Sequence, residues 1–346
     1  MAQINKPTDY FNTKLYTGTG ATHNVTGVGF QPDWVLINNR TGTYATTIFD
    51  AVRGATKFLE PAGGAAEQTY ADTLTSFDSD GFTLGADTSS FCNRGSAPNS
   101  YVAWNWLGAN GTASNTDGSI TSTVSANTTS GFSIVSYTGN GTAGATVGHG
   151  LGVAPKMIIF KSRSNGTKNW ITYHDGIGNT KAIFLNLTQA TGTGSDYWNN
   201  TSPTSSVFTL GDNTNHNESS GNMIAYCFAE KKGFSKFGSY TGNGNADGTF
   251  IYLGFKPAFV VTKRTNDTSD WILWDNKRPE RNETNLYLLA NSSNLEATDG
   301  GIDILSNGFK ARKTGISLNA SGSSYIYMAF AESPLVGTNN IPAVAR

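Results

Sequence analysis

Residues 137–141 and 240–244 both read Tyr-Thr-Gly-Asn-Gly, and residues 16–20 read Tyr-Thr-Gly-Thr-Gly. Each copy of this phrase is followed by a proline and then by a short apolar run. The copies begin roughly 100 to 120 residues apart, which is longer than the roughly 20 to 50 residues of a solenoid repeat and enough for a separate hydrophobic core. The chain therefore reads as three tandem domains.

Two strand signals recur in every copy. The apolar runs at 34–37, 157–160 and 259–261 are short and rich in β-branched and aromatic residues, which predicts strands buried on both faces. In the closing segment of each copy, large apolar side chains alternate with smaller ones, which predicts a strand with one large apolar face. The smaller side chains lie on the opposite face and include Cys227 as a packing residue. The large apolar side chains are Val102, Trp104 and Trp106, then Ile224, Tyr226 and Phe228, then Ile326, Met328 and Phe330.

The predicted fold class is all-β, with three tandem β-sandwich domains of jelly-roll-like type, since Asp-Gly and Asn-Gly turns are frequent and no helical period is present. The joint between the second and third domains is very short, so we expect those two in fixed contact and the first freer to swing. The predicted segments are an N-terminal arm (1–9), repeat 1 (10–107), a linker rich in Gly, Ser, Thr and Asn (108–130), repeat 2 (131–230), repeat 3 (231–334) and a C-terminal tail (335–346).

Composition excludes several partners. The 346 residues carry a formal net charge of −1 and scattered Lys and Arg, so a nucleic-acid partner is not expected. No stretch approaches the roughly 18 apolar residues of a membrane span, and the N-terminus has no apolar core of a secretory signal. We therefore expect synthesis in a host cytoplasm and no membrane insertion. Cys92 and Cys227 lie at non-equivalent places, which favours free, packed thiols.

Aspartates form the first candidate sites. Asp78 and Asp80 resemble the opening of a calcium loop but lack its downstream Glu, so they are weak calcium candidates and a turn is the main interpretation. Three further aspartates follow aromatic segments and have a basic residue nearby. An ion pair or turn cap is the favoured interpretation for them, with calcium as the alternative. These pairs are Asp50 with Arg53, Asp175 with Lys181, and Asp275 with Arg278.

Catalytic signatures are weak. The four histidines do not recur at matching places, and neither a Gly-x-Ser-x-Gly elbow nor a His-Glu-x-x-His motif is present. The glycine-rich phrase lacks the Gly-Lys-Ser/Thr ending of a phosphate loop, so it is interpreted as a turn. The sequence predicts no catalytic residue, no cofactor and no enzyme activity.

A carbohydrate contact is the sharper alternative. Tyr197, Trp198, Asn199 and Asn200 lie in a polar segment where an aromatic residue has no periodic reason to be buried. Exposed loop aromatics are often used for recognition, and Asn side chains suit sugar hydroxyls. These four residues are the candidate ligand contacts. Packing of the aromatics on their own domain or on a neighbouring subunit is the other interpretation.

The phrase also carries a resemblance. Together with Gly-Phe-x-Pro and a strand ending in Lys and Arg, and with the ends at 10–16 and 337–346, it resembles the repeated domain of uncharacterised virion proteins from tailed phages of marine bacteria. The resemblance covers nearly the whole chain and implies a tail-fibre or other virion-surface component. No catalytic residue is carried over from it.

These observations lead to three function hypotheses. The main one is a non-enzymatic virion structural protein on the tail or capsid, a fibre, adhesin or decoration for host attachment or shell reinforcement. Its expected partners are other virion proteins and further copies of itself, with a homotrimer as the specific case, although three domains on one chain can give threefold packing without oligomerising. The alternative is a glycan-binding receptor-recognition module, and the weaker alternative is a polysaccharide depolymerase.

Overall fold

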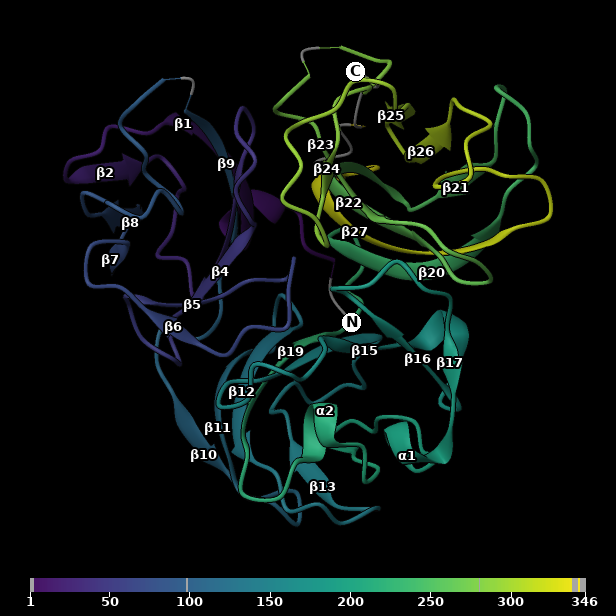
Figure 1. The fold of residues 1–346 in the computed structure, drawn as a ribbon. Helices are drawn as coiled ribbons and strands as arrows, with labels where there is room; N and C mark the ends of the chain where they lie inside the picture. The colour runs from purple at the N-terminus through teal and green to yellow at the C-terminus, as the bar shows by residue number, and fades with distance from the viewer. Residues whose placement is uncertain (1–2, 98, 280, 338–341, 343–346) are drawn as a thin grey trace.

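Three lobes surround a common centre, and each lobe is one of the three repeats (Figure 1). The computed structural model describes residues 3–97, 99–279, 281–337 and 342. Strands dominate these residues, which confirms the predicted all-β, sandwich-like fold class. None of the helices in this part of the chain has the length and apolar character needed to cross a membrane.

Repeat 1 is a large antiparallel sheet facing a small one. Its strands are β1 (Phe11–Thr17), β2 (His23–Thr26), β3 (Trp34–Asn39), β4 (Thr47–Asp50), β5 (Lys57–Leu59), β6 (Gln68–Thr69), β7 (Leu74–Asp78), β8 (Gly81–Leu84) and β9 (Ser100–Trp106). The large sheet has the order β1-β9-β3-β4-β5-β6 and the small sheet β2-β8-β7. The closing strand β9 thus lies between the first and third strands.

Repeat 2 follows the same plan with additions. Its elements are β10 (Ala113–Asn115), β11 (Ser122–Asn127), β12 (Phe132–Thr138), β13 (Thr146–Gly148), β14 (Met157–Ser162), β15 (Ile171–His174), the 3-10 turn η2 (Asp175–Ile177), β16 (Lys181–Phe184), β17 (Gly192–Thr193), α1 (Ser195–Trp198), β18 (Val207–Thr209), α2 (Thr214–Asn217) and β19 (Asn222–Phe228). The large sheet has the order β10-β11-β12-β19-β14-β15-β16-β17, and β13 pairs with β18.

Repeat 3 keeps the shared core of this plan. Its strands are β20 (Ser235–Thr241), β21 (Phe250–Tyr252), β22 (Phe255–Arg264), β23 (Trp271–Asp275), β24 (Leu288–Leu289), β25 (Ile302–Leu305), β26 (Gly308–Ala311) and β27 (Ser324–Pro334). The large sheet has the order β20-β27-β22-β23-β24 and the small sheet β21-β26-β25. The closing strand again lies between the first and third strands of the sheet.

Each large sheet is covered on both faces. One face packs on the small sheet of its own repeat and forms a separate hydrophobic cluster there. The other face, with the large side chains predicted for β9, β19 and β27, joins a single cluster built from all three repeats. Strands β3 and β14 are therefore buried along their whole length, as the sequence predicted.

Equivalent aromatic residues meet at the centre. The closing strands β9, β19 and β27 carry Trp106, Phe228 and Phe330 at the same place. These residues pair with Trp34 of β3, Met157 of β14 and Phe259 of β22, respectively. Their ring centroids lie 6.5 Å (Trp106–Phe228), 5.4 Å (Trp106–Phe330) and 6.0 Å (Phe228–Phe330) apart. The three repeats thus surround a local threefold axis, and the head-to-tail contacts between them close into a ring.

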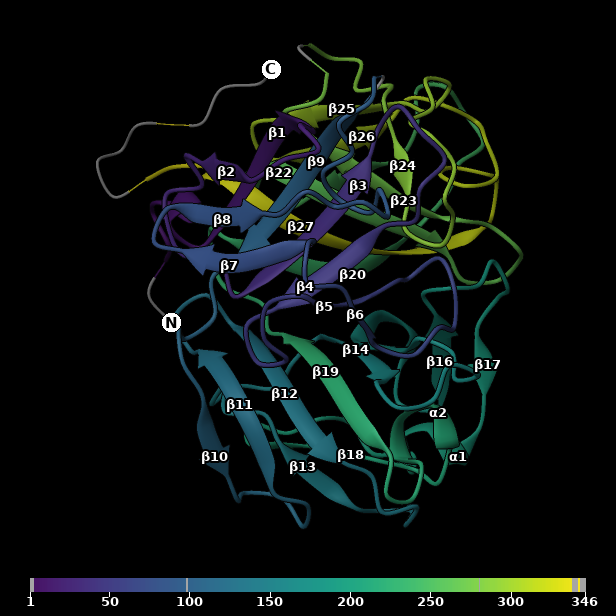
Figure 2. The ribbon, with the colours of Figure 1, turned by 60° about the vertical axis from the view of Figure 1, so that its left-hand side comes forward.

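Residues 108–130, assigned to a linker from sequence, hold β10 and β11, which extend the large sheet of repeat 2. Figure 2 shows both strands beside β12. The turn before them is tied to repeat 1, since the Gly108 amide donates to Asp33 Oδ2 at 2.7 Å. Repeat 1 also supplies Trp34 and Trp104 to the shared cluster, so the prediction of a first domain free to swing is wrong.

The N-terminal arm lies against the joint between repeats 2 and 3. The N-terminal arm ends in the 3-10 turn η1 (Pro7–Asp9), and the Ile4 amide donates to the Lys232 carbonyl at 3.0 Å. Ile4 is buried in the shared cluster. Most of the predicted tail at 335–346, namely 338–341 and 343–346, lies outside the described residues, as do 1–2 of the arm.

Candidate functional site

The repeated phrase forms the same anchored turn three times. Its glycines have structural reasons: a Cβ on Gly139 would lie 2.5 Å from the Glu218 carbonyl oxygen, so the two turns approach too closely for a side chain. The phrase tyrosine fixes the turn by donating its hydroxyl to a distant carbonyl. These bonds are Tyr16 to Cys92 (2.7 Å), Tyr137 to His216 (2.7 Å) and Tyr240 to Leu318 (2.8 Å).

One buried asparagine per repeat completes the anchor and was missed from the sequence. Asn93, Asn217 and Asn319 directly follow the residue that accepts the tyrosine hydroxyl, and all are fully buried. Each side-chain oxygen accepts a main-chain N–H of the phrase, at 2.8 to 3.0 Å. An Asn recurring upstream of every closing strand was the available signal. The phrase is therefore a folding element, as its interpretation as a turn predicted.

The interface between repeats 1 and 2 contains a buried charged cluster. The Asp50 and Arg53 side chains are fully buried, and Arg53 Nε donates to Asp50 Oδ2, so this predicted ion pair is confirmed. Tyr226 of repeat 2 donates its hydroxyl to the same carboxylate oxygen at 2.7 Å. Burial alone would lower the pKa of the Arg53 guanidinium, but the adjacent Asp50 charge raises it, so the guanidinium stays charged. Glu67 then bridges outward and accepts two bonds from Arg163 of repeat 2, at 2.9 and 3.1 Å.

The interface between repeats 3 and 1 repeats this arrangement. Arg278 Nε donates to Asp275 in a pair that is also fully buried, which confirms the second prediction. Trp104 of repeat 1 donates its indole N–H to Asp275 Oδ2 at 3.2 Å, in the place of the Tyr226 hydroxyl. Glu296 bridges to Arg40 of repeat 1, which donates from Nε at 3.0 Å and from Nη2 at 2.9 Å.

The interface between repeats 2 and 3 uses a histidine at the same position. His174 pairs with Met157, as Asp50 pairs with Trp34, so His174 and not Asp175 is the structural equivalent. Its Nε2 donates across the interface to the Tyr327 carbonyl at 3.1 Å, and its Nδ1 accepts the Gly176 amide at 3.0 Å. Burial lowers the pKa of His174 to about 4, so the imidazole is neutral near pH 7.

The third predicted ion pair is wrong. Asp175 lies at the surface and pairs with Lys156 at 2.9 Å, while Lys181 is exposed on β16. Ile177, three residues after His174, takes the place of Arg53 and packs against the shared cluster. An apolar residue thus stands where the other two interfaces have a guanidinium.

The candidate sugar contacts split between core and surface. Trp198 is only 2% exposed, donates its indole N–H to the Lys181 carbonyl at 2.7 Å and stacks on Phe160. It is a core side chain, in line with the other interpretation given to it. Tyr197 is half-buried, and Asn199 and Asn200 are exposed in left-handed turn conformations with φ of 51° and 50°.

The weak calcium candidates are occupied by hydrogen bonds of the chain itself. Asp80 accepts the amides of Gly29 and Gly27 at 2.6 and 3.0 Å, which lowers the pKa of its carboxyl. Asp78 accepts the Ser76 and Thr83 hydroxyls. Among the described residues no group of three or more His, Cys, Asp or Glu is placed to hold a metal ion. The hairpin turn interpretation therefore accounts for both aspartates.

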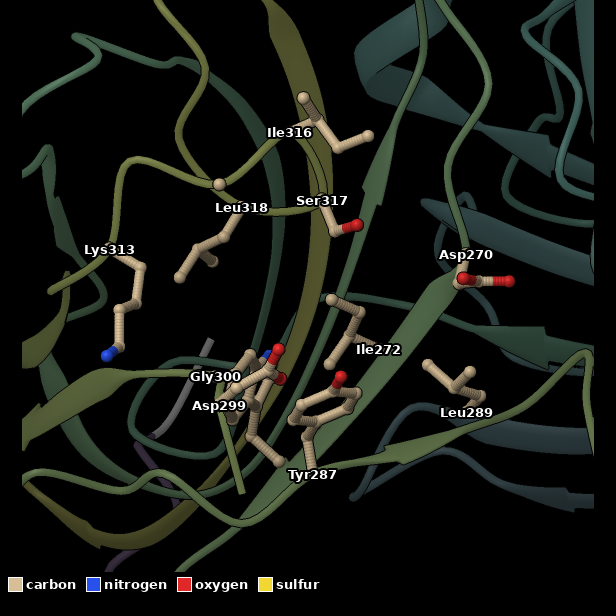
Figure 3. A pocket seen from close by; sticks show the side chains of 12 residues that line it. Asp270, Ile272, Tyr287, Leu289, Asp299, Gly300, Lys313, Ile316, Ser317 and Leu318 are labelled. Carbon is tan, nitrogen blue, oxygen red and sulfur yellow. The ribbon is translucent and has the colours of Figure 1, made fainter. Parts of the chain in front are cut away.

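Repeat 3 contains an open cavity of about 240 Å³ between its large sheet and the loops of its small sheet (Figure 3). Its wall is formed by Tyr287 with apolar side chains of β23 and β24. Asp299 lies beside the Tyr287 ring in Figure 3. Burial raises the pKa of Tyr287 to about 12, and the Asp299 carboxylate adds to this rise, so the phenol stays protonated near pH 7. No local sequence pattern indicates this cavity, because its lining residues come from four separate segments.

A wider groove of about 530 Å³ runs between repeats 2 and 3. Lys156, Lys232, Lys236 and Tyr252 are among its lining residues. Lys156 pairs with Asp175 at 2.9 Å, and Lys236 donates to the Tyr252 carbonyl at 2.8 Å. Two of its cations are thus bound to acceptors of the chain itself.

These features define an all-β protein in which three sandwich repeats close into a ring around one aromatic core. The chain belongs to the family described as Domain of unknown function (DUF7483), whose match covers residues 6–334 and so spans all three repeats. No curated protein and no solved structure matches the chain.

Proposed function

We propose that this chain is a non-enzymatic structural protein of a tailed-phage virion, exposed on the tail or capsid as a fibre, adhesin or decoration. The observation that supports this most is the closure of three sandwich repeats into one ring with a shared aromatic core. A closed ring presents several loop surfaces at fixed angles, which suits attachment to a host or reinforcement of a shell. The resemblance of the phrase to virion repeats supports the same role.

The buried charged residues support a structural role as well. Asp50, Arg53, Asp275 and Arg278 are each bonded across or beside a repeat interface, so their charges are used to join repeats. We expect other virion proteins as partners. The internal threefold arrangement already supplies three sandwich units per chain, and self-association into a homotrimer stays a separate prediction.

A map of the whole phage particle at side-chain resolution tests this proposal. We expect density for the three-lobed ring on the outer surface of the tail or capsid. Mass spectrometry of purified particles provides the simpler check. Particles that lack the chain contradict a virion role, and purified protein that releases reducing ends from host polysaccharide contradicts the non-enzymatic part.

The second candidate function is a glycan-binding module for receptor recognition. The cavity in repeat 3 favours it, because a tyrosine and apolar side chains there lie next to carboxylate, hydroxyl and ammonium groups. A glycan array probed with the full chain tests this candidate. Binding to host-surface glycans supports it, and an array without any bound glycan contradicts it.

A further inference from the structure

The three repeats differ in the side chains that fill the space between the large and the small sheet at one equivalent position. One equivalent residue per repeat, in β5, in β16 and directly before β24, lies on the face toward this place, as the strand pairing fixes it. The equivalent residues are Phe58 (paired with Gln68), Ala182 (paired with Gly192) and Tyr287 (paired with Ala297). The side chains around them decide whether the place is closed or open.

Repeats 1 and 2 close it with aromatic rings. In repeat 1 the rings of Phe58, Tyr70 and Phe91 contact one another, with centroids 4.6 to 5.8 Å apart. In repeat 2 the small Ala182 leaves room for the indole of Trp198, which is 2% exposed. Phe58 and Trp198 are buried, while Tyr70, which is 37% exposed, and the partly buried Phe91 cover this place at the surface of repeat 1.

Repeat 3 has short polar side chains where repeat 1 has rings. Asp299 lies two residues beyond the residue that pairs with Tyr287, which is the place of Tyr70. Ser317 directly precedes the residue whose carbonyl accepts the phrase tyrosine, which is the place of Phe91. The cavity of about 240 Å³ opens here. The place that aromatic rings occupy in repeats 1 and 2 is thus lined by short polar side chains and open in repeat 3.

The lining combines two kinds of contact. Tyr287, Ile272, Leu289 and Leu318 give an apolar wall with an aromatic ring. Around it lie Asp270, Asp299, Lys313 and Ser317, with Asp270 and Lys313 at opposite ends in Figure 3. The Asn291 amide holds Asp270 by donating to its Oδ1 at 2.7 Å. A ligand here meets apolar surface on one side and both donors and acceptors at its edge.

We propose that this cavity binds the terminal one or two residues of a neutral glycan. The C–H face of a sugar ring packs on apolar and aromatic surface, while its hydroxyls donate to Asp270 or Asp299 and accept from Lys313 or Ser317. The lining holds charges of both signs, which the hydroxyls of a neutral sugar can contact without bringing in a further unpaired charge, and its two carboxylates against one ammonium group disfavour an anionic ligand. The cavity is smaller than the roughly 300 to 1,000 Å³ of pockets for drug-sized ligands, which favours the end of a glycan over its length.

The proposal rests on the second candidate function, and its test separates the two. The full chain is titrated with neutral hexoses, N-acetylhexosamines and their disaccharides, with a uronic acid and a hexosamine as charged comparisons, by isotope-edited NMR or calorimetry. We expect saturable binding of a neutral sugar. Ser317→Phe restores the ring of repeat 1 and should weaken binding by about tenfold or more, because it removes the space that the ligand fills.

Three further variants keep the test decisive. Asp299→Tyr should also weaken binding. Asp270→Asn at the rim should weaken binding with the packing unchanged, so it tests the pocket even if Ser317→Phe fails to fold. Tyr70→Asp in repeat 1 is the matched control and should leave the affinity unchanged. Glycan binding that survives both Ser317→Phe and Asp270→Asn would show that the chain binds glycans elsewhere. That result rejects this cavity as the site and leaves the glycan-binding function supported. Preference for a charged sugar, or no binding by any sugar, overturns the proposal.

Discussion

The interfaces of the ring differ in the residue that ends the fourth strand of the shared plan, which is Asp50 in repeat 1, Asp275 in repeat 3 and His174 in repeat 2. All three side chains accept an amide of the loop that follows them and make a hydrogen bond to the closing strand of the next repeat. The aspartates need a buried Arg as a counter-ion, while the neutral imidazole needs none. All three interfaces thus share a bridging hydrogen bond. A charged side chain is used at two of them, and there it is accompanied by a buried arginine.

The largest expected effect comes from breaking a buried pair. Asp50→Ala leaves the Arg53 guanidinium buried without its main partner, and should lower the free energy of unfolding by about 3–5 kcal/mol. Urea denaturation followed by tryptophan fluorescence measures this loss. Asp175→Ala removes the exposed partner of Lys156 and is the matched control, with an expected change below about 1 kcal/mol. Equal losses in the two variants would contradict the assignment of the interface.

The neutral histidine predicts a pH dependence for the remaining interface. The pKa of His174 is about 4 in the folded chain against an ordinary 6.5, so the unfolded chain binds a proton that the folded chain does not. Its contribution is present above pH 6.5 and is lost as the pH falls toward 4, by on the order of 3 kcal/mol.

His174→Gln keeps one donor and one acceptor but does not titrate. The fall in stability between pH 6.5 and 4 should therefore be shallower in this variant, measured by denaturation at several pH values. Burial also lowers the pKa of His216 to about 4, so part of the slope should remain. A variant that keeps the full slope would show that His174 is not the buried titrating group of this interface.

The smallest effect concerns a single hydroxyl. Tyr226→Phe removes the donor to Asp50 but keeps the Asp50–Arg53 pair, and should cost about 1–2 kcal/mol in urea denaturation. Tyr327 contacts His174 through its main-chain carbonyl, so Tyr327→Phe is the matched control. Its expected change is within about 0.5 kcal/mol. A larger loss for Tyr327→Phe than for Tyr226→Phe would contradict the comparison of the two interfaces.

The sequence predicted the strands and their faces well, because alternation along a closing strand depends on local pattern. It did not indicate that the large faces meet one another, since strands such as β3 are apolar on both faces and burial by a second sheet or by another repeat gives the same pattern. The sequence comparison aligned Asp175 with Asp50, whereas His174 is the true equivalent. The register of β15 is fixed by its pairing with β14, and the sequence alone does not reveal that pairing.

The candidate site was harder to predict. Trp198 stands in a polar segment, yet its ring fills space left by Ala182 on a strand far enough away in sequence that no local pattern links them. The cavity of repeat 3 depends on short side chains at Asp299 and Ser317, and only the alignment of three folded repeats shows that rings are missing there. Differences between equivalent places in folded copies carried this information.

The most direct test of the ring is native-state hydrogen exchange on the wild type and on Trp106→Ala. The Trp106 indole lies beside the local threefold axis and contacts both Phe228 and Phe330, and its removal should cost about 3–5 kcal/mol. If the three repeats form one cooperative unit, amide protection should fall by similar amounts in β9, β19 and β27. A loss confined to β9 would contradict the shared core and show that the repeats are stabilised separately.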